Sequence, residues 1–340
     1  MQAAISFGSC RVEDRRAQAL ELGRRGFLLV AGGVAAAVGA SRALGQPKVP
    51  AETMAQWDAA PSIPLWPGAA PNGGFRRQPQ AEGAPPMFVR NVEQPYLRVF
   101  RPQKPNGRSL LSIPGGAYTF VSIANEGVDV AADMTARGYT VFVLVYRLPG
   151  EGWTKREDVP LQDAQRAVRI IRARSAEYGC DPDQLYVVGF SAGGHLAASL
   201  ETGFAEKVYD PQDAADSLSA RPRSVGLIYP VISQTEGIGH AESTLRLLGP
   251  SPSMLSIVRR SPDLHVSENT PPTFLVHSMD DPAVPLENSL LMMGALRGAR
   301  RPVEAHFFER GGHGFGTGQA GQPNGEWLQL FANWMQMHAQ

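Results

Sequence analysis

Cysteine is almost absent from this chain of 340 residues, which contains only Cys10 and Cys180. Two cysteines are too few for a disulfide scaffold or for a cysteine-rich metal site. We interpret Cys180, which follows a glycine at an expected helix end, as a small buried apolar residue and not as a nucleophile. The histidines show no spacing with Asp or Glu that suggests a metal site, and no motif calls for a cofactor.

An excess of charge of one sign is also missing. Lys plus Arg and Asp plus Glu both number 32, so the formal net charge is zero. The chain therefore has no basic field for nucleic acid and no acidic tail. Hydrophobic residues make up 43% of it, which is enough for a sizeable core and too much for a disordered protein.

Apolar runs long enough to cross a membrane are lacking as well. The N-terminal run is about 14 residues long, short of the roughly 20 that a spanning helix needs. Residues 24–28 read RRGFL before this run, and residues 43–45 read ALG after it. The pattern resembles a twin-arginine export signal cleaved before Gln46. We predict a signal peptide over 1–45, engagement of the export machinery, and a periplasmic or secreted protein; an uncleaved membrane anchor is the alternative.

The remaining sequence predicts one α/β domain. Residues 46–86 are rich in Pro, Gly and Ala and predict an extended arm with little regular structure, anchored by Trp57 and Trp66. In the domain, 87–340, runs typical of strands alternate with amphipathic helix-length stretches. Strands are expected at 96–100, 110–113, 140–145, 185–188, 225–229, 273–277 and 303–308, and helices at 128–137, 161–178, 195–200, 286–296 and 327–337. This alternation predicts a mainly parallel sheet with helices on both faces.

One stretch interrupts the alternation. Residues 231–270, about 40 residues rich in Ser, Gly and Pro, predict an insertion in the domain. Because long irregular segments in compact domains usually carry function, we interpret it as a lid or substrate loop.

The strongest local motif is a serine between glycines. Residues 189–193 read GFSAG, directly after the apolar run 185–188 and before a helix-compatible stretch. In a G-x-S-x-G turn the serine has strained dihedral angles, and side chains at the flanking positions would collide with the neighbouring strand and helix. Ser191 is therefore a candidate nucleophile, placed at the carboxyl edge of the sheet. His195, four residues later, is interpreted as a packed, hydrogen-bonded residue.

A serine nucleophile needs a base and a group that orients the base. Residues 311–315 read GGHGF after the last expected strand, which predicts His313 on a mobile, exposed loop that can reach the serine. Residues 277–285 read HSMDDPAVP at the end of another strand and offer two carboxylates, Asp280 and Asp281. Ser191, His313 and one of these aspartates form the predicted triad.

At these residues the chain resembles the α/β-hydrolase superfamily. Its order of serine, aspartate and histidine is the order of that fold. Residues 277–285 resemble the family pattern H-G-x-x-D-x-x-V-P, with Ser278 in place of the glycine. This register implies that Asp281 is the triad acid and that Asp280 is a solvated turn residue.

The resemblance also implies an oxyanion hole. Residues 113–118 read IPGGAY after a strand, where lipase and esterase members carry H-G-G-G. Backbone amides of a glycine turn can point at a developing oxyanion. By resemblance the donors are the amide of Ala192 and that of Gly115 or Gly116. Tyr118, next to this turn, is expected to line the acyl pocket; the alternative for the turn is a purely structural role.

Further segments resemble one branch of the superfamily. Residues 65–68 (LWPG), 146–149 (YRLP) and 161–164 (LQDA) look like those of bacterial acetylesterases and acetylxylan-esterase-like hydrolases, which are related to feruloyl esterases. Arg147 and Asp163 are expected to pair or to hold loops near the site, and Glu126 to join them. Trp66 and Trp153 could stack on a sugar but are interpreted as anchors.

The resemblance implies a serine ester hydrolase that needs no cofactor and acts on short-chain, above all acetyl, esters of small molecules or plant oligosaccharides. Three alternatives stay open. The same triad could serve a peptidase or amidase, or a feruloyl esterase. The third is a non-catalytic binding protein that kept the fold.

Overall fold

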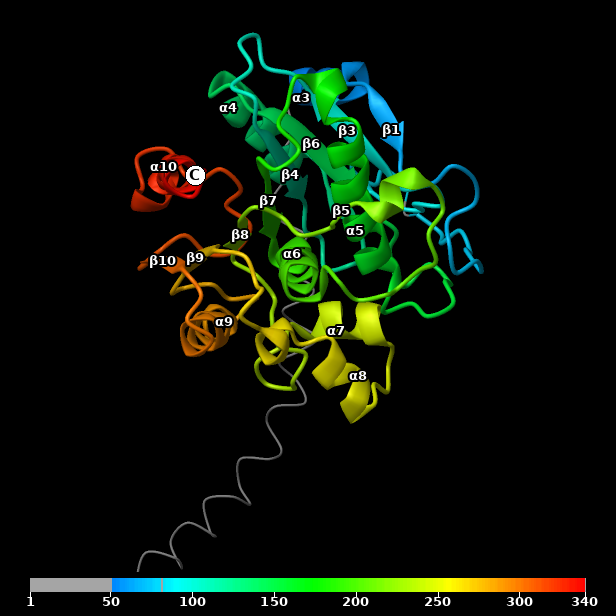
Figure 1. Ribbon diagram of the computed structural model, residues 1–340. Helices are drawn as coiled ribbons and strands as arrows, with labels where there is room; N and C mark the ends of the chain where they lie inside the picture. Colours follow the sequence, from blue (N-terminus) through cyan, green and yellow to red (C-terminus); the bar gives the residue numbers. More distant parts are fainter. Residues whose placement is uncertain (1–50, 81, 340) are drawn as a thin grey trace, which may run out of the picture. The chain divides into compact units, whose positions relative to one another are not determined.

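The computed structural model describes residues 51–80 and 82–339, so the predicted signal peptide over 1–45 lies outside the described residues. Within them the chain folds around an eight-stranded sheet in the order β1-β3-β6-β4-β7-β8-β9-β10 (Figure 1). The strands are β1 (Ser62–Pro64), β3 (Tyr96–Phe100), β6 (Thr140–Val145), β4 (Ser109–Ile113), β7 (Leu185–Phe190), β8 (Val225–Ile228), β9 (Thr273–Ser278) and β10 (Val303–Phe308).

The sheet is mainly parallel, as the sequence predicts. Every neighbouring pair from β6 to β10 is parallel, and only β1 with β3 and β3 with β6 are antiparallel. All residues of β4, β6 and β7 are buried because helices cover both faces, which explains why these strands read as nearly continuous apolar runs. The carboxyl ends of the parallel strands therefore meet along one edge.

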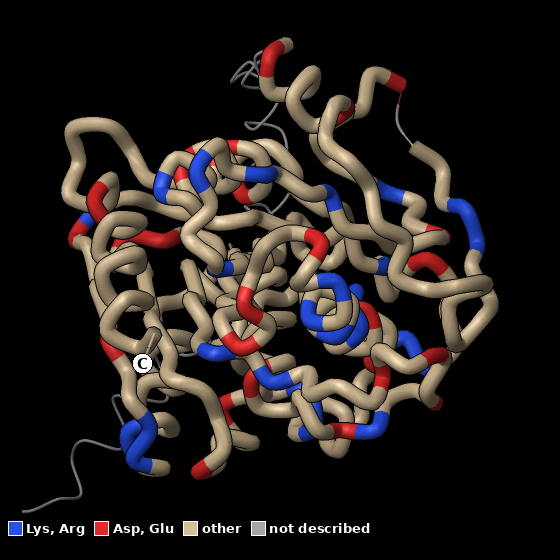
Figure 2. Tube along the Cα trace, turned by 45° about the horizontal axis from the view of Figure 1, so that its top comes forward, with Lys and Arg blue, Asp and Glu red and all other residues tan. Residues whose placement is uncertain are grey.

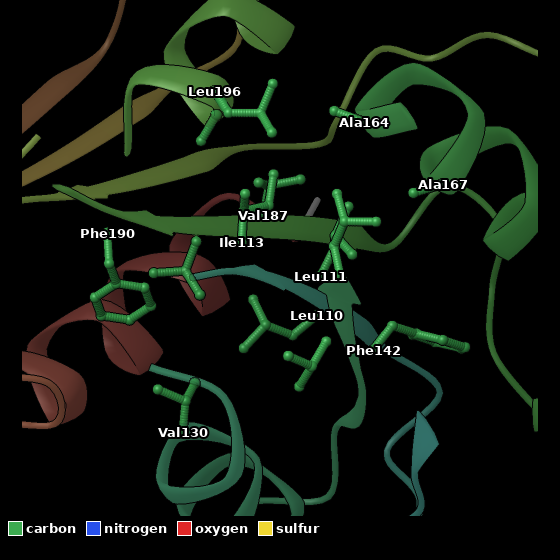
Figure 3. Packing of buried hydrophobic residues seen from close by; sticks show 14 of the residues in the cluster. Leu110, Leu111, Ile113, Val130, Phe142, Ala164, Ala167, Val187, Phe190 and Leu196 are labelled. Atoms are coloured by element: carbon green, nitrogen blue, oxygen red, sulfur yellow. The ribbon is translucent and has the colours of Figure 1, made fainter. Parts of the chain in front are cut away.

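The covering helices lie close to where the hydrophobic pattern predicts them. They are α4 (Asp129–Ala136), α5 (Val159–Ala173), α6 (Ser191–Gly203), α9 (Glu287–Gly298) and α10 (Trp327–Met337). Helices α5 and α6 pack on one face of the sheet and α4 and α10 on the other (Figure 3). In Figure 3, Ala164 and Leu196 lie above Leu111 of β4 and Val130 lies below it, so a continuous apolar core runs through the sheet.

The arm is more regular than predicted. Helix α3 (Ala51–Ala59) precedes β1, and β1 pairs with β3 at the edge of the sheet. Pro64 is tolerated in β1 because an edge strand leaves one side unpaired. The anchors are as expected, since Trp57 and Trp66 are both buried. The prediction of little regular structure over 46–86 is therefore wrong for this part of the arm.

The segment 231–270 also contains regular structure. It forms α7 (Ala241–Leu248), α8 (Met254–Arg259) and the 3₁₀ turn η5 (Pro262–His265). The side chains of His240 and Ser253 cap α7 and α8 by accepting from backbone amides. The amide of Val231 donates to the carbonyl of Ser191 at 3.1 Å, so the segment starts beside the predicted nucleophile.

Short elements complete the fold. They are the β2–β5 pair (Phe88–Val89 and Val121–Ser122), the π-helical turn η2 (Ala124–Val128), and the 3₁₀ turns η3 (Ser175–Tyr178), η4 (Ala214–Ser217) and η6 (Pro323–Glu326). Charges of both signs are interspersed along the chain (Figure 2). Cys180 is buried, as the sequence predicts. Over residues 51–80 and 82–339, none of the helices combines the length and apolarity needed to span a membrane.

Candidate active site

Ser191 lies on the sharp turn between β7 and α6 and has a φ of +52°, a strained left-handed conformation for a non-glycine residue. The flanking glycines are required sterically. A Cβ on Gly189 would lie 2.4 Å from the carbonyl oxygen of Gly193, and a Cβ on Gly193 would lie 2.2 Å from that of Ile113. The turn therefore holds the serine at the carboxyl edge of the sheet, as the motif predicts.

The structure brings the three predicted triad residues together. His313 Nε2 lies 2.9 Å from Ser191 Oγ, and His313 Nδ1 lies 2.7 Å from Asp281 Oδ2. A carboxylate can only accept, so the Nδ1–H donates to Asp281 and Nε2 accepts from the serine hydroxyl. This is the tautomer in which the imidazole can remove a proton from Ser191.

Asp281 is held in its charged form. Its Oδ1 accepts from the amides of Ala283 at 2.8 Å and Val284 at 2.9 Å, and His277 Nε2 lies 3.2 Å from Oδ2. Burial alone would raise the pKa of Asp281, but the hydrogen bonds from His277 and His313 outweigh it and hold that pKa well below its usual value. The charge therefore persists at neutral pH.

Asp280 has a different neighbour. It is exposed, and its Oδ1 accepts from the amide of Gly312 at 2.8 Å. The carboxylate of Asp280 thus bonds to the backbone of the histidine loop at Gly312 and does not contact the imidazole of His313. The aspartate that lies against His313 is Asp281, the one that the family pattern implies.

The histidine loop is more firmly held than predicted. The side chain of His313 is 22% exposed, so it is only partly accessible. The side-chain Nδ2 of Asn125 donates to the carbonyl of Gly314 at 3.1 Å. The N–H of Gly316 donates to the Tyr229 hydroxyl, and its carbonyl accepts from the Trp327 indole, both at 3.0 Å. The loop is therefore less exposed than expected, and side chains from η2, from the residue after β8 and from α10 hold it in place.

The glycine turn after β4 lies directly against the serine. A Cβ on Gly115 would lie 2.9 Å from Ser191 Cβ, and one on Gly116, whose φ is +127°, would lie 2.2 Å from the Phe120 carbonyl oxygen. No hydrogen bond from the amides of Gly116 and Ala117 to a protein acceptor is found among the described residues, and Ala192 stands in the first turn of α6, where amides lack an intrahelical partner. These N–H groups are candidate donors to an oxyanion at Ser191.

Gly115 departs from the prediction. Its amide donates to Glu126 Oε2 at 2.7 Å and is therefore already occupied. Of the two glycines that the resemblance left open, only Gly116 has a free amide, and Ala117 is a donor that sequence reasoning missed. The left-handed φ of Ala117, +54°, could not be read from the sequence.

Glu126 joins the glycine turn to the histidine loop. Besides Gly115, it accepts from the Tyr229 hydroxyl at 2.9 Å, and Tyr229 also packs its ring 4.9 Å from the imidazole of His313, measured between ring centroids. Burial raises the pKa of Glu126, while the bonds from Gly115 and Tyr229 oppose that rise. The expectation that Glu126 joins Arg147 and Asp163 is wrong, since its carboxylate is committed elsewhere.

Tyr118 does not present its hydroxyl to the site. The residue is 1% exposed, and its hydroxyl lies 2.7 Å from His195 Nδ1. His195 Nε2 in turn lies 2.8 Å from the Arg260 carbonyl oxygen, and burial lowers the pKa of His195 to about 4. The neutral His195 is packed and bonded as predicted. The hydroxyl of Tyr118 points to this interior histidine, although the residue also lines a cavity beside the glycine turn.

Arg147 and Asp163 form the expected ion pair, at 2.8 Å and with both side chains fully buried. Asp163 also accepts from the Trp66 indole at 2.9 Å, which ties the arm to the domain. Trp66 and Trp153 are both buried, so the structure places them as anchors.

The segment 231–270 reaches the rim of the site. Glu242 of α7 accepts from the Thr119 hydroxyl at 3.2 Å, just beyond the glycine turn. His240, which caps α7, lies near enough to His313 for that imidazole to contribute to lowering the pKa of His240, although burial is the larger cause. Across the described ranges, 51–80 and 82–339, no group of three or more His, Cys, Asp or Glu residues could hold a metal ion.

The fold and this arrangement define the α/β-hydrolase class, and comparison with known proteins agrees. A family model described as BD-FAE matches residues 97–296. The chain is 38% identical over 60% of its length to endo-1,4-beta-xylanase B of Butyrivibrio fibrisolvens, and 30% identical over 69% of its length to an acetylxylan esterase of Xylanibacter ruminicola. It covers 32% and 47% of these two relatives, so it spans less than half of either.

A solved structure matches over most of the chain. The acetyl ester-xyloside bifunctional hydrolase of Caldicellulosiruptor lactoaceticus is 34% identical, with a TM-score of 0.69 over 82% of this chain and 96% of that one. The chain belongs to the BD-FAE family. This domain is thereby placed among the carboxylic ester hydrolases of the acetylxylan-esterase-like branch.

Proposed function

We propose that the protein is a serine esterase that removes short acyl groups, acetyl above all, from plant-polysaccharide fragments. The observation that carries this proposal is the continuous chain from Ser191 Oγ through His313 to Asp281, at 2.9 and 2.7 Å, beside free amides. The substrate class is supported by the names of the relatives, an acetylxylan esterase and an acetyl ester-xyloside hydrolase.

The proposed reaction follows from the positions of these groups. Ser191 Oγ attacks the ester carbonyl while His313 takes the hydroxyl proton, and the carbonyl oxygen becomes an oxyanion bound by the free amides. When the C–O bond to the alcohol breaks, His313 gives the proton to the leaving alcohol. Water then attacks the acyl-enzyme with the same base and releases the acid, which restores Ser191. Asp281 orients the imidazole and stabilises its positive form.

Three measurements test the proposal. A fluorophosphonate should form an adduct on Ser191 of the folded wild-type protein, and Ser191→Ala should form none. Acetylated and feruloylated xylan should then be compared by release of acetate and of ferulate. Faster release of ferulate would replace acetyl by feruloyl as the acyl group. A 4-nitroanilide cleaved faster than 4-nitrophenyl acetate would favour the amidase alternative, and absence of any adduct would favour a binding protein.

We also propose export to the periplasm by the twin-arginine route. Support comes from the RRGFL segment at 24–28, followed by an apolar run too short to span a membrane. The described domain does not need an oxidising compartment to fold, since its single cysteine, Cys180, is free and buried. Replacing both Arg24 and Arg25 by Lys should leave the protein in the cytoplasmic fraction. The wild-type N-terminus should begin at Gln46, and an N-terminus that retains residues 1–45 would contradict cleavage.

A further inference from the structure

A cavity of about 230 Å³ lies against the glycine turn, with Tyr118 and Thr119 in its wall. Whole-ligand sites usually measure roughly 300–1,000 Å³, so this cavity suits one substituent of a substrate and not a whole molecule. Thr119 follows Ala117 by two residues, and consecutive Cα atoms are about 3.8 Å apart, so this wall lies within about 8 Å of the free Ala117 amide. The cavity therefore adjoins the glycine turn that packs against Ser191, on the side where Thr119 bonds to Glu242.

Two arginines give this cavity its charge. Arg90 and Arg246 both line it. Arg246 Nε bonds to Glu242 at 2.7 Å, which leaves the rest of its guanidinium for other acceptors. Arg90 lies over the Phe120 ring, 5.6 Å from its centroid, and pairs with no carboxylate in the described part of the chain. In a protein with zero net charge, these side chains leave the cavity locally positive.

Glu151 is the acidic residue in the wall, and it does not neutralise the arginines. One oxygen of its carboxyl group accepts from the amide of Asn91 and the other from that of Val92. Burial raises the pKa of Glu151 to about 7, although those amides, Arg77 and Arg90 oppose the rise. Both oxygens of Glu151 are thus engaged by backbone amides, and the two arginines outnumber this one acidic residue in the wall.

We propose that this cavity is a substrate subsite that binds a carboxylate group carried by the ester, through Arg90 and Arg246. The guanidinium presents donors in a fork that matches a carboxylate, and a charge-assisted hydrogen bond is stronger than a neutral one. The inference rests on the proposed ester hydrolysis. It adds that preferred substrates are acidic, such as an acetylated sugar that also bears a carboxyl group.

Matched esters test the subsite from both sides of the scissile bond. In one arm the leaving group carries the charge, with 4-acetoxybenzoate compared with the neutral 4-acetoxybenzamide. In the other arm the acyl group carries it, with 4-nitrophenyl monoadipate compared with 4-nitrophenyl hexanoate. Each kcat/KM is divided by the uncatalysed rate of the same ester. We expect the acidic ester to be preferred about tenfold in at least one arm, mainly through KM, and the preference to shrink at high salt.

Variants assign that preference to the arginines. Arg90→Gln and Arg246→Gln should each reduce it several-fold, and Arg90→Lys should keep part of it. Arg137→Gln is the matched control, since Arg137 pairs with Asp133 on α4 and does not line the cavity. Equal rates for acidic and neutral esters in both arms, or a preference that survives both Gln variants, would overturn the subsite.

Failure of the subsite differs from failure of the proposed function. If neutral esters are cleaved without any preference for acidic ones, only the subsite is wrong. If every ester is inert, the proposed function is wrong, and calorimetric titration with 4-hydroxybenzoate and 4-hydroxybenzamide decides the subsite by itself. Tighter binding of the acid that Arg90→Gln abolishes would support it, and equal binding would overturn it.

Discussion

Replacing Asp281 by Asn tests the orientation of the catalytic base. In the wild type, Oδ1 accepts from the amides of Ala283 and Val284, and Oδ2 faces His313 Nδ1 at 2.7 Å. The two backbone donors select the carbonyl oxygen of an asparagine, so its NH₂ group must face the imidazole. Two donors cannot bond to one another, and we therefore expect the proton of His313 to move to Nε2.

The magnitude follows from this wrong tautomer. An imidazole with its proton on Nε2 cannot accept the proton of Ser191, and the negative charge that stabilised the imidazolium is gone. We expect kcat to fall by about 10⁴, a barrier increase of about 5 kcal/mol, with KM nearly unchanged. The assay is steady-state hydrolysis of 4-nitrophenyl acetate, with circular dichroism as the check on folding.

Asp280→Asn is the matched control. Asp280 accepts one bond, from the amide of Gly312, and an asparagine carbonyl can still accept it. This variant should stay close to wild-type activity. If Asp281→Asn kept more than about a tenth of the activity, or if Asp280→Asn were the damaging change, the assignment of the triad acid would be wrong.

Three further predictions concern the same site. Ser191→Ala should lower the turnover number by about 10⁴–10⁶ without unfolding the protein; a residual rate near that of the wild type would refute the nucleophile. Glu126→Ala leaves the Gly115 amide and the Tyr229 hydroxyl unpaired. It should lower kcat by about 10- to 100-fold and change KM much less. Glu126→Gln keeps one acceptor and should recover part of that loss, whereas equal losses in both variants would contradict a positioning role. Finally, the neutral His195 should make stability depend on pH. Because burial lowers its pKa from 6.5 to about 4, the unfolded chain binds more protons between these values, and the free energy of unfolding should fall by about 3 kcal/mol as the pH drops through that window. Urea unfolding of the wild type and of His195→Gln measures the free energy of unfolding across this pH window. If that free energy depended on pH equally in both proteins, His195 would not be the cause.

The sheet and the triad could be predicted because each depends on a local pattern. The strands are buried on both faces, so residues such as 140–145 read as uninterrupted apolar runs. The glycines around Ser191 follow from sterics at one turn. The residues alone left Asp280 and Asp281 open, and only the resemblance to the family pattern favoured Asp281; in the structure its carboxylate accepts from the amide of Val284 at 2.9 Å.

The remaining parts of the site depend on contacts between distant segments. Glu126 accepts a hydrogen bond from Tyr229, which lies 103 positions later in the sequence, and no local pattern predicts this pair. The amide of Gly115 is occupied by the other oxygen of the same carboxylate, at 2.7 Å, and no motif in the sequence indicates that bond. Helices α7 and α8 escaped prediction because a Ser-, Gly- and Pro-rich composition hides short helices of eight and six residues.

The place of β10 at the margin of the sheet has a consequence for inactivation by heat. This strand pairs with β9 on one side, lies last in the strand order and has no fully buried residue. His313 follows it directly, while Ser191 follows β7 in the interior. Fraying of β10 would free the N-terminal end of the histidine loop, so that the bonds at Gly314 and Gly316 alone would hold the imidazole near the serine, and it would leave the central strands intact. Catalysis should therefore be lost on warming several degrees before the far-ultraviolet signal of the sheet changes.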